Sequence, residues 1–407
     1  MKMAVLMKKE SRILWIFWIV IFVSKIAVSP ACAESIKVGV ILPLTGRLFK
    51  LGGEIEHKSF LMAVDEINKS GGINGKEIDL IMEDTAGRPD VGRSAVEKLI
   101  SKEKVVLISG GISSTVTWAA AAMAQKFKVP FLVNTASADR ITERGWEYIF
   151  RLNPPVSEYP KTLSSFMEMV AKPKSLGILY ENTPFGQFWL KEFIKQYDSI
   201  ELKLVIKEEY KVGSTDFRPL LLRIKEKEPD MIYLISHFMD AALLLKQIKG
   251  SDLNPKLILG HAAGVTHPEF QKYAEDASEY IYSTAIWAPS APYRGAKDYH
   301  EKFITTYNAP PDYHGAQAYA AMYVIGDALR RAKSLEPKDI RDALSETELM
   351  TVFGPVRFIS YGRKRQQNRV PTLLFQWLNG QLETVWPRKI ATAPLVYPMP
   401  KWVERYQ

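Results

Sequence analysis

Short apolar runs alternate with amphipathic stretches along the first third of the chain. Each run has the length of a buried strand, and each stretch spaces its apolar residues as one face of a helix does. Expected strands and helices alternate at residues 36–42, 53–69, 77–83, 90–101, 105–109 and 114–127. In the helix at 53–69 we expect a buried stripe of Ile55, Leu61, Val64 and Ile67. This order is typical of βαβ units and predicts a parallel sheet.

The same rhythm restarts after the sequence NPP at residues 153–155. The second series of expected strands and helices lies at residues 175–180, 185–197, 201–210, 216–227, 230–236, 239–250 and 256–260. A side chain is available to cap the helix at 216–227, from Ser214, Thr215 or Asp216. The last third holds a long helix at 318–333 and a hairpin turned at Asn379-Gly380. Two βα series separated by this break predict two α/β lobes.

The first 33 residues differ from the rest of the chain. Basic residues precede an unbroken apolar run at residues 13–23, and Ala31 and Ala33 form an A-x-A pattern shortly after it. The run is shorter than the roughly 20 apolar residues that a membrane span needs. We therefore interpret residues 1–33 as a secretory signal peptide that is cleaved after Ala33, and we expect a periplasmic protein.

The only cysteine, Cys32, lies inside this segment. Cleavage before Cys32 would leave a lipid anchor, but Ser29 and Pro30 fit such a site poorly, so cleavage after Ala33 is favoured. The mature chain then has no cysteine, which excludes disulfides, thiol catalysis and cysteine-bound metals. The segment carries five basic residues and one acidic residue, so its removal lowers the net charge from +9 to +5. No recognition motif accompanies that charge, and we expect no nucleic-acid partner.

The motifs of common enzyme classes are missing from the sequence. No serine lies in a G-x-S-x-G elbow, no H-E-x-x-H is present, and the six histidines show no close metal-ligand spacing. The segment GGINGKE is one residue short of a phosphate loop and carries Glu77 where such a loop has Ser or Thr. No dinucleotide fingerprint follows the first strand. We therefore expect a protein that is not an enzyme and that holds no cofactor or metal.

Small polar residues follow two neighbouring expected strands. The first loop, SGGISS, opens a helix with Ser113 and Ser114, and the second, NTAS, contains Thr135, Ala136 and Ser137. Ligands of open α/β sheets bind at the carboxyl ends of strands, and the free N–H groups at a helix N-terminus attract anions. A serine cap with nothing bound is the alternative for the first loop. The two loops together favour a site for a small polar group.

In the order of its segments, the chain resembles the secreted substrate-binding proteins of ABC importers, of the branched-chain amino-acid (Leu/Ile/Val) type. The matching segments are IKVGVILPLTG, AVDEINKSGGINGKEIDLIMEDTAG, SGGISSTVT, VPFLVNTASADRITERGWEYIFRLNPP, YENTPFGQ, STDFRPLLLRIKEKEPDMIYL and FGPVRFISYG. They span nearly the whole mature chain. The resemblance implies the type I periplasmic binding protein fold, in which two Rossmann-like α/β lobes with parallel sheets are joined by a three-crossover hinge and close on a ligand in the cleft.

The resemblance also implies the division of the chain and its partners. The implied parts are an N-terminal lobe of residues 34–153 plus 286–362, a C-terminal lobe of residues 154–285 plus 363–400, and a tail of residues 401–407. We expect a monomeric extracytoplasmic solute-binding protein that delivers a small-molecule ligand to an ABC-importer permease. A ligand-sensing receptor subunit of the same fold is the alternative.

Several site residues follow from the resemblance. Ser114 and residues 135–137 match the family's cradle for a ligand carboxylate, in which backbone N–H groups and hydroxyls neutralise the anion. His237 or Phe238 falls where amino-acid binders place an aromatic residue near the ligand. Tyr159 is expected near the hinge and the cleft.

One position departs from the family's pattern. Amino-acid binders place an acidic residue after the strand that matches KLILG, and here Ala262 stands there, beside His261. A buried ammonium without a partner costs several kcal/mol, so Asp240 or Glu181 would have to replace the missing acid. We therefore expect an organic acid, an amide or another small polar ligand, to which His261 can hydrogen-bond. Some aromatic residues would suit an apolar tail, although residues of this kind more often belong to a core than to a pocket: Phe49, Trp118, Phe238 and Trp287.

Overall fold

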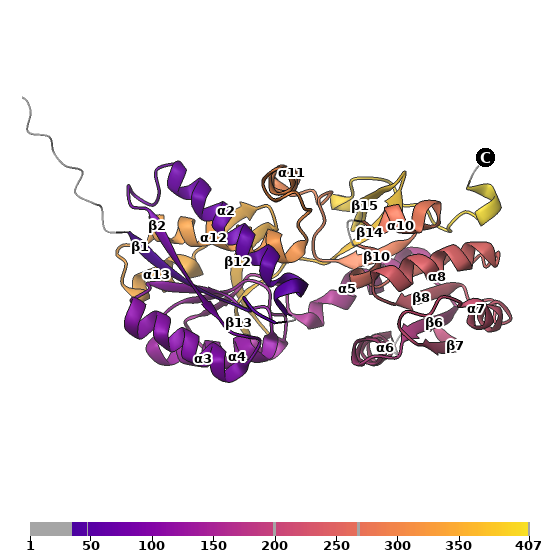
Figure 1. Ribbon diagram of the computed structural model, residues 1–407, viewed down its shortest axis with the longest axis horizontal. Coiled ribbons are helices and arrows are strands. Elements are labelled where there is room, and N and C mark those ends of the chain that lie inside the picture. The colour runs from indigo at the N-terminus through magenta and orange to yellow at the C-terminus, as the bar shows by residue number, and fades with distance from the viewer. Residues whose placement is uncertain (1–34, 47, 198–200, 267–268, 406–407) are drawn as a thin grey trace, which may run out of the picture.

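The computed structural model describes residues 35–405 except Arg47, residues 198–200 and residues 267–268. The expected signal peptide and Cys32 lie outside the described residues. Two lobes lie side by side along the long axis of the molecule (Figure 1). Within the described residues, no helix is both long enough and apolar enough to cross a membrane.

An eight-stranded sheet forms the centre of the first lobe. Its strands are β1 (Ile36–Leu42), β2 (Ile78–Asp84), β3 (Leu107–Gly110), β4 (Phe131–Val133), β5 (Ile149–Arg151), β11 (Glu348–Thr351), β12 (Gly354–Tyr361) and β13 (Lys364–Asn368). They lie in the order β11-β12-β13-β5-β4-β3-β1-β2, and β1 to β5 run parallel. Its main helices are α2 (Glu54–Lys69), α3 (Pro89–Lys98), α4 (Ser114–Phe127), α12 (Tyr313–Arg331) and α13 (Pro337–Ser345). The pair α2 and α12 covers one face of the sheet, and the pair α3 and α4 covers the other (Figure 1).

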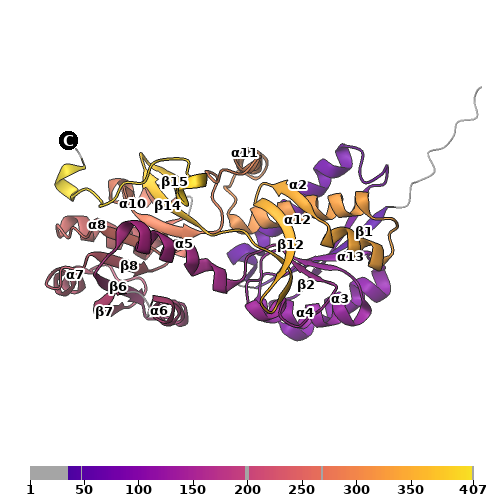
Figure 2. The same ribbon diagram turned by 180° about the vertical axis from the view of Figure 1, so that it is seen from behind.

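A seven-stranded sheet forms the centre of the second lobe. Its strands are β6 (Ser175–Glu181), β7 (Lys203–Tyr210), β8 (Met231–Ile235), β9 (Leu257–Gly260), β10 (Tyr282–Ala285), β14 (Leu373–Leu378) and β15 (Gln381–Trp386), in the order β15-β14-β10-β9-β8-β6-β7. Strands β6 to β10 run parallel, and β14 and β15 add an antiparallel hairpin (Figure 2). Its helices are α5 (Tyr159–Phe166), α6 (Pro184–Tyr197), α7 (Arg218–Lys225), α8 (Phe238–Gly250), α9 (Ala262–Val265) and α10 (Phe270–Ala274).

The expected alternation of strands and helices is present in both lobes. The hairpin turn at Asn379 and Gly380 is confirmed, because both residues adopt the positive φ (54° and 72°) that a type I′ turn requires. Phe217, directly before α7, makes no side-chain capping bond. One of the three expected residues, Asp216, accepts a hydrogen bond from the backbone N–H of Arg218, the first helical residue, at 3.1 Å and pairs with its guanidinium at 2.7 Å.

The buried face of α2 also differs from the expected stripe. Leu61 is 43% exposed, whereas Glu56 and Phe60 are fully buried. Glu56 receives hydrogen bonds from the loop after β4, and the Ser59 hydroxyl hydrogen-bonds the Tyr299 hydroxyl at 2.8 Å. These polar groups can be buried because distant segments supply their partners. Apolar spacing alone therefore placed Leu61 on the wrong side of the helix.

The chain crosses between the lobes three times. The crossings join β5 to α5, β10 to α11 (Ala296–Tyr307, on the first-lobe core) and β13 to β14. We expected the first lobe to end at residue 362, but β13 pairs with β12 and β5, so the third crossing follows Asn368. The expected tail at 401–407 also differs, because Trp402 is buried in the second core and its indole N–H donates to the Leu253 carbonyl at 2.8 Å.

Candidate functional site

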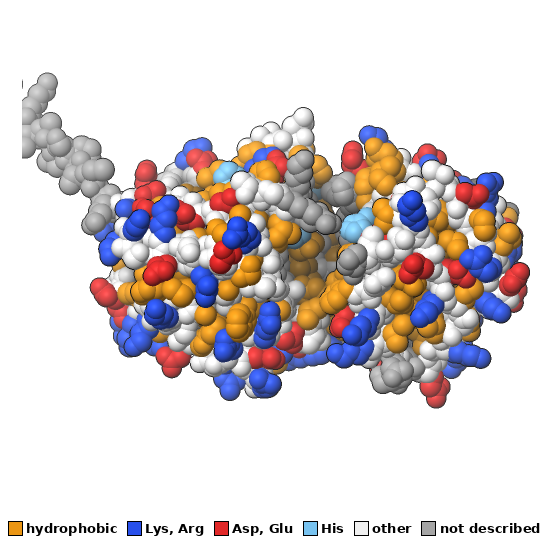
Figure 3. All heavy atoms as spheres, turned by 60° about the horizontal axis from the view of Figure 1, so that its bottom comes forward, with side chains coloured by type: hydrophobic (Ala, Val, Ile, Leu, Met, Phe, Trp, Pro, Cys, Tyr) orange, Lys and Arg blue, Asp and Glu red, His pale blue; other side chains and the backbone are white. Residues whose placement is uncertain are grey.

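The carboxyl ends of the parallel strands in the two lobes face each other. In the first sheet Gly110, Val133 and Arg151 are neighbours in register, so β3, β4 and β5 end at one edge. The ends of β6, β8 and β9 are aligned in the same way in the second sheet. The first two crossings leave directly from these two edges, which turns the edges toward each other. The surface is hollowed between the lobes (Figure 3).

Two glycines make the sharp turn from β3 into α4. Gly110 has a φ of +109°, and a Cβ there would lie 2.2 Å from the Ile41 carbonyl oxygen. Gly111 has a φ of +98°, and a Cβ there would lie 2.6 Å from Thr117 Oγ1. Only glycine fits both the backbone conformation and the space. The side chain of Ser113, the residue before α4, makes no capping hydrogen bond.

The loops after β3 and β4 are held together by hydrogen bonds. The Ala138 N–H donates to Ser114 Oγ at 3.1 Å, and the N–H of the buried Ala136 donates to the Gly111 carbonyl at 2.8 Å. Because Ser114 Oγ accepts from the backbone, its own proton remains available to a ligand. The structure thus brings Ser113 and Ser114 beside the loop that holds Thr135, Ala136 and Ser137, at one strand edge.

Thr135 has a different partner from the one that the resemblance implies. Its hydroxyl donates to Glu56 Oε1 at 2.6 Å, and the Asn134 amide donates to Glu56 Oε2 at 2.8 Å. Burial raises the pKa of Glu56 to about 7, against the charge of His314, which lowers it. The hydroxyl proton of Thr135 is therefore committed to Glu56 and not to a ligand.

Tyr159 lies where two crossings meet. Its hydroxyl hydrogen-bonds Asn153 at 3.1 Å, and its carbonyl accepts from Thr372 Oγ1 in the third crossing at 3.0 Å. Burial raises the pKa of the Tyr159 phenol, and hydrogen bonds to Asn153 and Ser137 oppose that shift. Tyr159 therefore connects the loop after β4 to the hinge.

A buried carboxylate orients His237 at the edge of the second sheet. Glu181, which ends β6, is 1% exposed and lies 2.9 Å from His237 Nδ1. It also accepts from the His237 backbone N–H at 3.1 Å and from Thr183 Oγ1 at 2.6 Å. The His237 side chain is half exposed. Because Nδ1 is engaged, Nε2 is the ring nitrogen left for a ligand.

Two aromatic rings adjoin the histidines at this edge. Phe185 lies 4.3 Å from His237 and 5.0 Å from His261 between ring centroids, and Trp189 lies 4.7 Å from His261. Burial lowers the pKa of His261 to about 3, and the nearby His237 adds to the effect, so His261 is neutral at physiological pH. We call Phe185, Trp189, His237 and His261 the aromatic–imidazole wall.

The remaining second-lobe residues named from the sequence are Phe238, Asp240 and Ala262. Phe238 packs against the second core and meets Tyr273 edge-on, with ring centroids 5.2 Å apart. Asp240 is buried and accepts from the Gly213 N–H at 3.0 Å. Ala262 begins α9, directly after the carboxyl end of β9, and is partly buried.

The aromatic residues suggested for an apolar tail have other surroundings. Trp287 is buried, and its indole N–H donates to the Val352 carbonyl at 2.9 Å. Trp118 lies under the guanidinium groups of Arg140 and Arg144, at 5.1 and 4.8 Å from its ring centroid. Both rings are thus explained by packing. Phe49 is half-buried and begins the short π-helical segment η1 (Phe49–Gly53) that precedes α2.

Sequence reasoning missed four residues of this region. Arg151 ends the apolar run YIF, Glu56 lies in an amphipathic helix, and Phe185 and Trp189 follow a strand in YENTPFGQFW. A charged residue at the end of a buried strand was the available signal for Arg151. Nothing in the spacing around Glu56 indicated that it would be buried.

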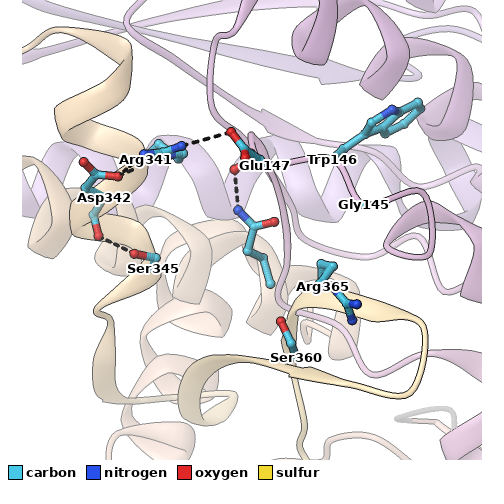
Figure 4. A pocket seen from close by; sticks show the side chains of 9 residues that line it. Gly145, Trp146, Glu147, Arg341, Asp342, Ser345, Ser360 and Arg365 are labelled. Atoms are coloured by element: carbon cyan, nitrogen blue, oxygen red, sulfur yellow. Dashed lines mark hydrogen bonds and ion pairs between the residues drawn. The ribbon is translucent and has the colours of Figure 1, made fainter.

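A second hollow, of about 400 Å³, lies on the first lobe between α13 and the β12–β13 hairpin. Figure 4 shows that Arg341 pairs with the two carboxylates at its rim, whereas Arg365 lies apart from them. Arg341 bonds Asp342 at 2.8 Å and Glu147 at 3.2 Å. None of the expected site residues lines this hollow, and it offers no cluster of unpaired charge to a ligand among the described residues.

Comparison with known proteins places the chain among binding proteins. The periplasmic binding protein family model matches residues 35–381. The Leu/Ile/Val-binding protein homolog 7 of Brucella suis biovar 1 (strain 1330) is 28% identical over 392 residues, which cover 91% of this chain and 96% of that protein. The corresponding homolog 7 of Brucella melitensis biotype 1 is 26% identical over 386 residues, with the same coverage.

Solved structures share the fold. The branched-chain amino acid transporter substrate-binding protein LivJ of Streptococcus pneumoniae, in complex with isoleucine, has a TM-score of 0.68 at 25% identity and covers 90% of this chain and 100% of its own. An ABC-transporter solute-binding protein of R. palustris, in complex with benzoate, has a TM-score of 0.66 at 19% identity. The match covers 89% of this chain and 97% of that protein's chain. With two facing α/β lobes and a family match over most of its length, the chain belongs to the periplasmic binding protein family.

Proposed function

We propose that the protein is an extracytoplasmic solute-binding protein that captures a small polar metabolite between its lobes and delivers it to an ABC permease. One observation carries the proposal: two strand edges face each other across the hinge, one with small hydrogen-bond donors and the other with the aromatic–imidazole wall. The relatives named for amino-acid binding and the structures with isoleucine or benzoate support it.

Within the expected class of organic acid, amide or amino-acid-like ligands, the organic acid fits best. Ser114 offers a hydroxyl proton to a carboxylate, and the loops beside it offer backbone N–H groups. A ligand ammonium would need an acid, but Ala262 stands at the usual position. Glu181 already accepts three donors, and Asp240 is bound to Gly213. The carboxylates that would replace the missing acid are therefore engaged.

The wall suits the rest of such a ligand. The rings of Phe185 and Trp189 provide an apolar surface, and His237 Nε2 provides one polar contact. His261 is neutral because burial lowers its pKa, so it adds no positive charge to the wall. A flat or branched apolar body that carries one carboxylate matches both faces of the cleft.

The proposed function also implies where the protein is located and which partners it has. We propose a periplasmic protein released by cleavage after Ala33, with a lipid anchor at Cys32 as the less favoured form, and a monomer without cofactor. The relatives are binding proteins, so we propose no catalysis. A receptor subunit that reports ligand occupancy is the second candidate, since the same closure would serve it.

Small-angle scattering of residues 34–407 tests the proposal. Benzoate, 4-methyl-2-oxopentanoate and leucine are added in turn, and the radius of gyration is compared with that of the ligand-free protein. We expect a decrease with at least one acid, because hinge closure brings the lobes together. A radius that none of these compounds changes, in a protein that is folded by circular dichroism, would contradict the proposal.

A further inference from the structure

Arg151 is the largest side chain that is fully buried among the described residues. Its guanidinium donates to Gln367 Oε1 at 2.6 Å and to Thr142 Oγ1 at 3.1 Å. It also donates to the carbonyl oxygens of Ala138 at 2.6 Å and Ala136 at 3.5 Å. All four acceptors are neutral. Two of them belong to the loop after β4, so the guanidinium lies directly behind this loop.

The positive charge of Arg151 has no carboxylate in ion-pair contact within the described part of the chain. Asp139 and Glu143 act on it through their charge, but both pair with Lys364, at 2.9 and 3.1 Å. Burial lowers the pKa of Arg151 to about 10, which leaves it charged at neutral pH. A buried cation is costly unless an anion compensates it, so this charge favours an anion on the other side of the loop.

The guanidinium also fixes the direction of two peptide groups. In a trans peptide the C=O and the following N–H point in opposite directions. The carbonyls of Ala136 and Ala138 point at Arg151, so the N–H groups of Ser137 and Asp139 point away from it. The Ser137 N–H has no acceptor among the described residues, and Ser137 is only partly buried. One donor of the loop is thus unoccupied and directed away from the buried charge.

We propose that Arg151 is the positioning residue that makes this loop select anions, because it orients the Ser137 and Asp139 N–H groups and places a buried positive charge behind them. The inference rests on the proposed function, in which a ligand carboxylate occupies the loop. Arg151 does not touch the ligand and acts through the peptide groups. The consequence is a preference for a carboxylate over its neutral amide, since the amide gains nothing from the charge.

Calorimetric titration of Arg151→Met tests this role with two acid–amide pairs, benzoate with benzamide and 4-methyl-2-oxopentanoate with its amide. We expect the variant to bind the acids about 10- to 100-fold more weakly than the wild type, while the amides change little. The control is Gln367→Met, which removes one partner of the guanidinium but keeps the charge and both carbonyl contacts. We expect it to keep the preference for acids.

The outcomes separate the two proposals. If neither acid binds the wild type, the carboxylate site and the role of Arg151 both fail. If an acid binds the wild type and Arg151→Met equally well, or if Gln367→Met loses the preference to the same extent, only the role of Arg151 is overturned. If Arg151→Met does not fold, the test is the NMR chemical shift of the Ser137 amide proton in the wild type, measured with and without each acid and amide. We expect a downfield shift with the acids alone, and an unmoved resonance overturns the inference.

Discussion

The backbone N–H of Ala138 donates to the hydroxyl oxygen of Ser114 across 3.1 Å, which joins the loop after β4 to the first turn of α4. This bond uses one of the two acceptor positions of the hydroxyl oxygen, so the hydroxyl proton can still be donated to another group. The strand β3 can turn sharply into α4 because Gly110 and Gly111 adopt positive φ and leave no room for a Cβ.

Replacing Ser114 and Ser137 together with alanine should weaken a carboxylate ligand. Each hydrogen bond to a charged group contributes about 1.5–3 kcal/mol, so the double variant should lose a few kcal/mol of binding free energy. Calorimetry with the tightest-binding acid measures the loss. Ser94→Ala, on the exposed surface of α3, is the control and should bind normally. Unchanged affinity in the double variant would show that these hydroxyls do not contact the ligand.

Ala262→Glu should shift the preference toward amines. Ala262 follows the carboxyl end of β9, at the sheet edge that faces the first lobe, so a carboxylate there can pair with a ligand ammonium. We expect leucine to gain affinity over 4-methyl-2-oxopentanoate, its deaminated analogue. Ala262→Gln, which has the same length without the charge, should not produce this change. An equal response in both variants would show that residue 262 does not face the ligand.

His237 and Phe238 are neighbours in sequence with different surroundings. His237→Phe keeps a ring beside Phe185 but removes Nε2, so acids should bind about tenfold more weakly, as for one lost hydrogen bond. Phe238→Leu should leave binding nearly unchanged, because Phe238 packs against Tyr273. Titration of both variants with the same acid shows which of the two side chains contacts the ligand. The reverse ranking would assign the ligand contact to Phe238.

Glu56 should make the protein less stable at pH 8 than at pH 5. Folding raises its pKa from 4.5 to about 7, so between these values the folded state holds a proton that the unfolded state has released. Stability therefore falls as pH rises through this window, by about 3 kcal/mol if Glu56 acts alone. The pKa of neighbouring His314 is raised by Asp312 and Glu56, although burial opposes this, and it adds to the same trend.

Urea denaturation of wild type and Glu56→Gln at both pH values measures this effect. Glutamine keeps the shape and cannot ionise, so the variant should show a smaller fall in the free energy of unfolding. Glu54→Gln, two residues earlier on α2, is partly exposed and serves as the control. A pH dependence that Glu56→Gln leaves intact would assign the titration to other groups.

Gly110→Ala should destabilise the first lobe. Its φ of +109° strains any other residue by about 1–3 kcal/mol, and the new Cβ would meet the Ile41 carbonyl oxygen at 2.2 Å. Gly145→Ala shares a positive φ of +70° but has nothing within 4 Å, so it should cost less. Urea midpoints compare the two variants. Equal midpoints would mean that the close contact with Ile41 carries no cost.

The alternation of strands and helices, the two lobes and the turn at Asn379 follow from local pattern, because period and turn chemistry are properties of neighbouring residues. The positions of Ser114 and Ser137 also follow, since parallel strands end at one edge. The partners of buried polar groups do not follow. Glu56 and Thr135 are 79 positions apart, and Arg151 and Gln367 are 216 apart, so only the folded chain joins them.

The same reason explains what the sequence misses in the second lobe. Glu181 can be proposed as a substitute acid from its place at the end of β6. The hydrogen bond between its carboxylate and His237, however, depends on the register of β6 and β8. The sequence predicts only that Phe185 belongs to an amphipathic helix. Its contacts with His237 and His261 depend on the tertiary fold.

Thermal denaturation of residues 34–407 with two acids, the neutral amide of each acid, and leucine tests the central claim most directly. The panel is benzoate, 4-methyl-2-oxopentanoate, leucine and the amides of the first two. A ligand that binds only the folded state adds about 2.7 kcal/mol at about 100 times its dissociation constant, which shifts the melting temperature measurably. We predict a rise with an acid that lacks an amine and none with its amide. A rise with leucine alone, or with the amides as much as with the acids, would contradict a carboxylate site that needs no ammonium partner.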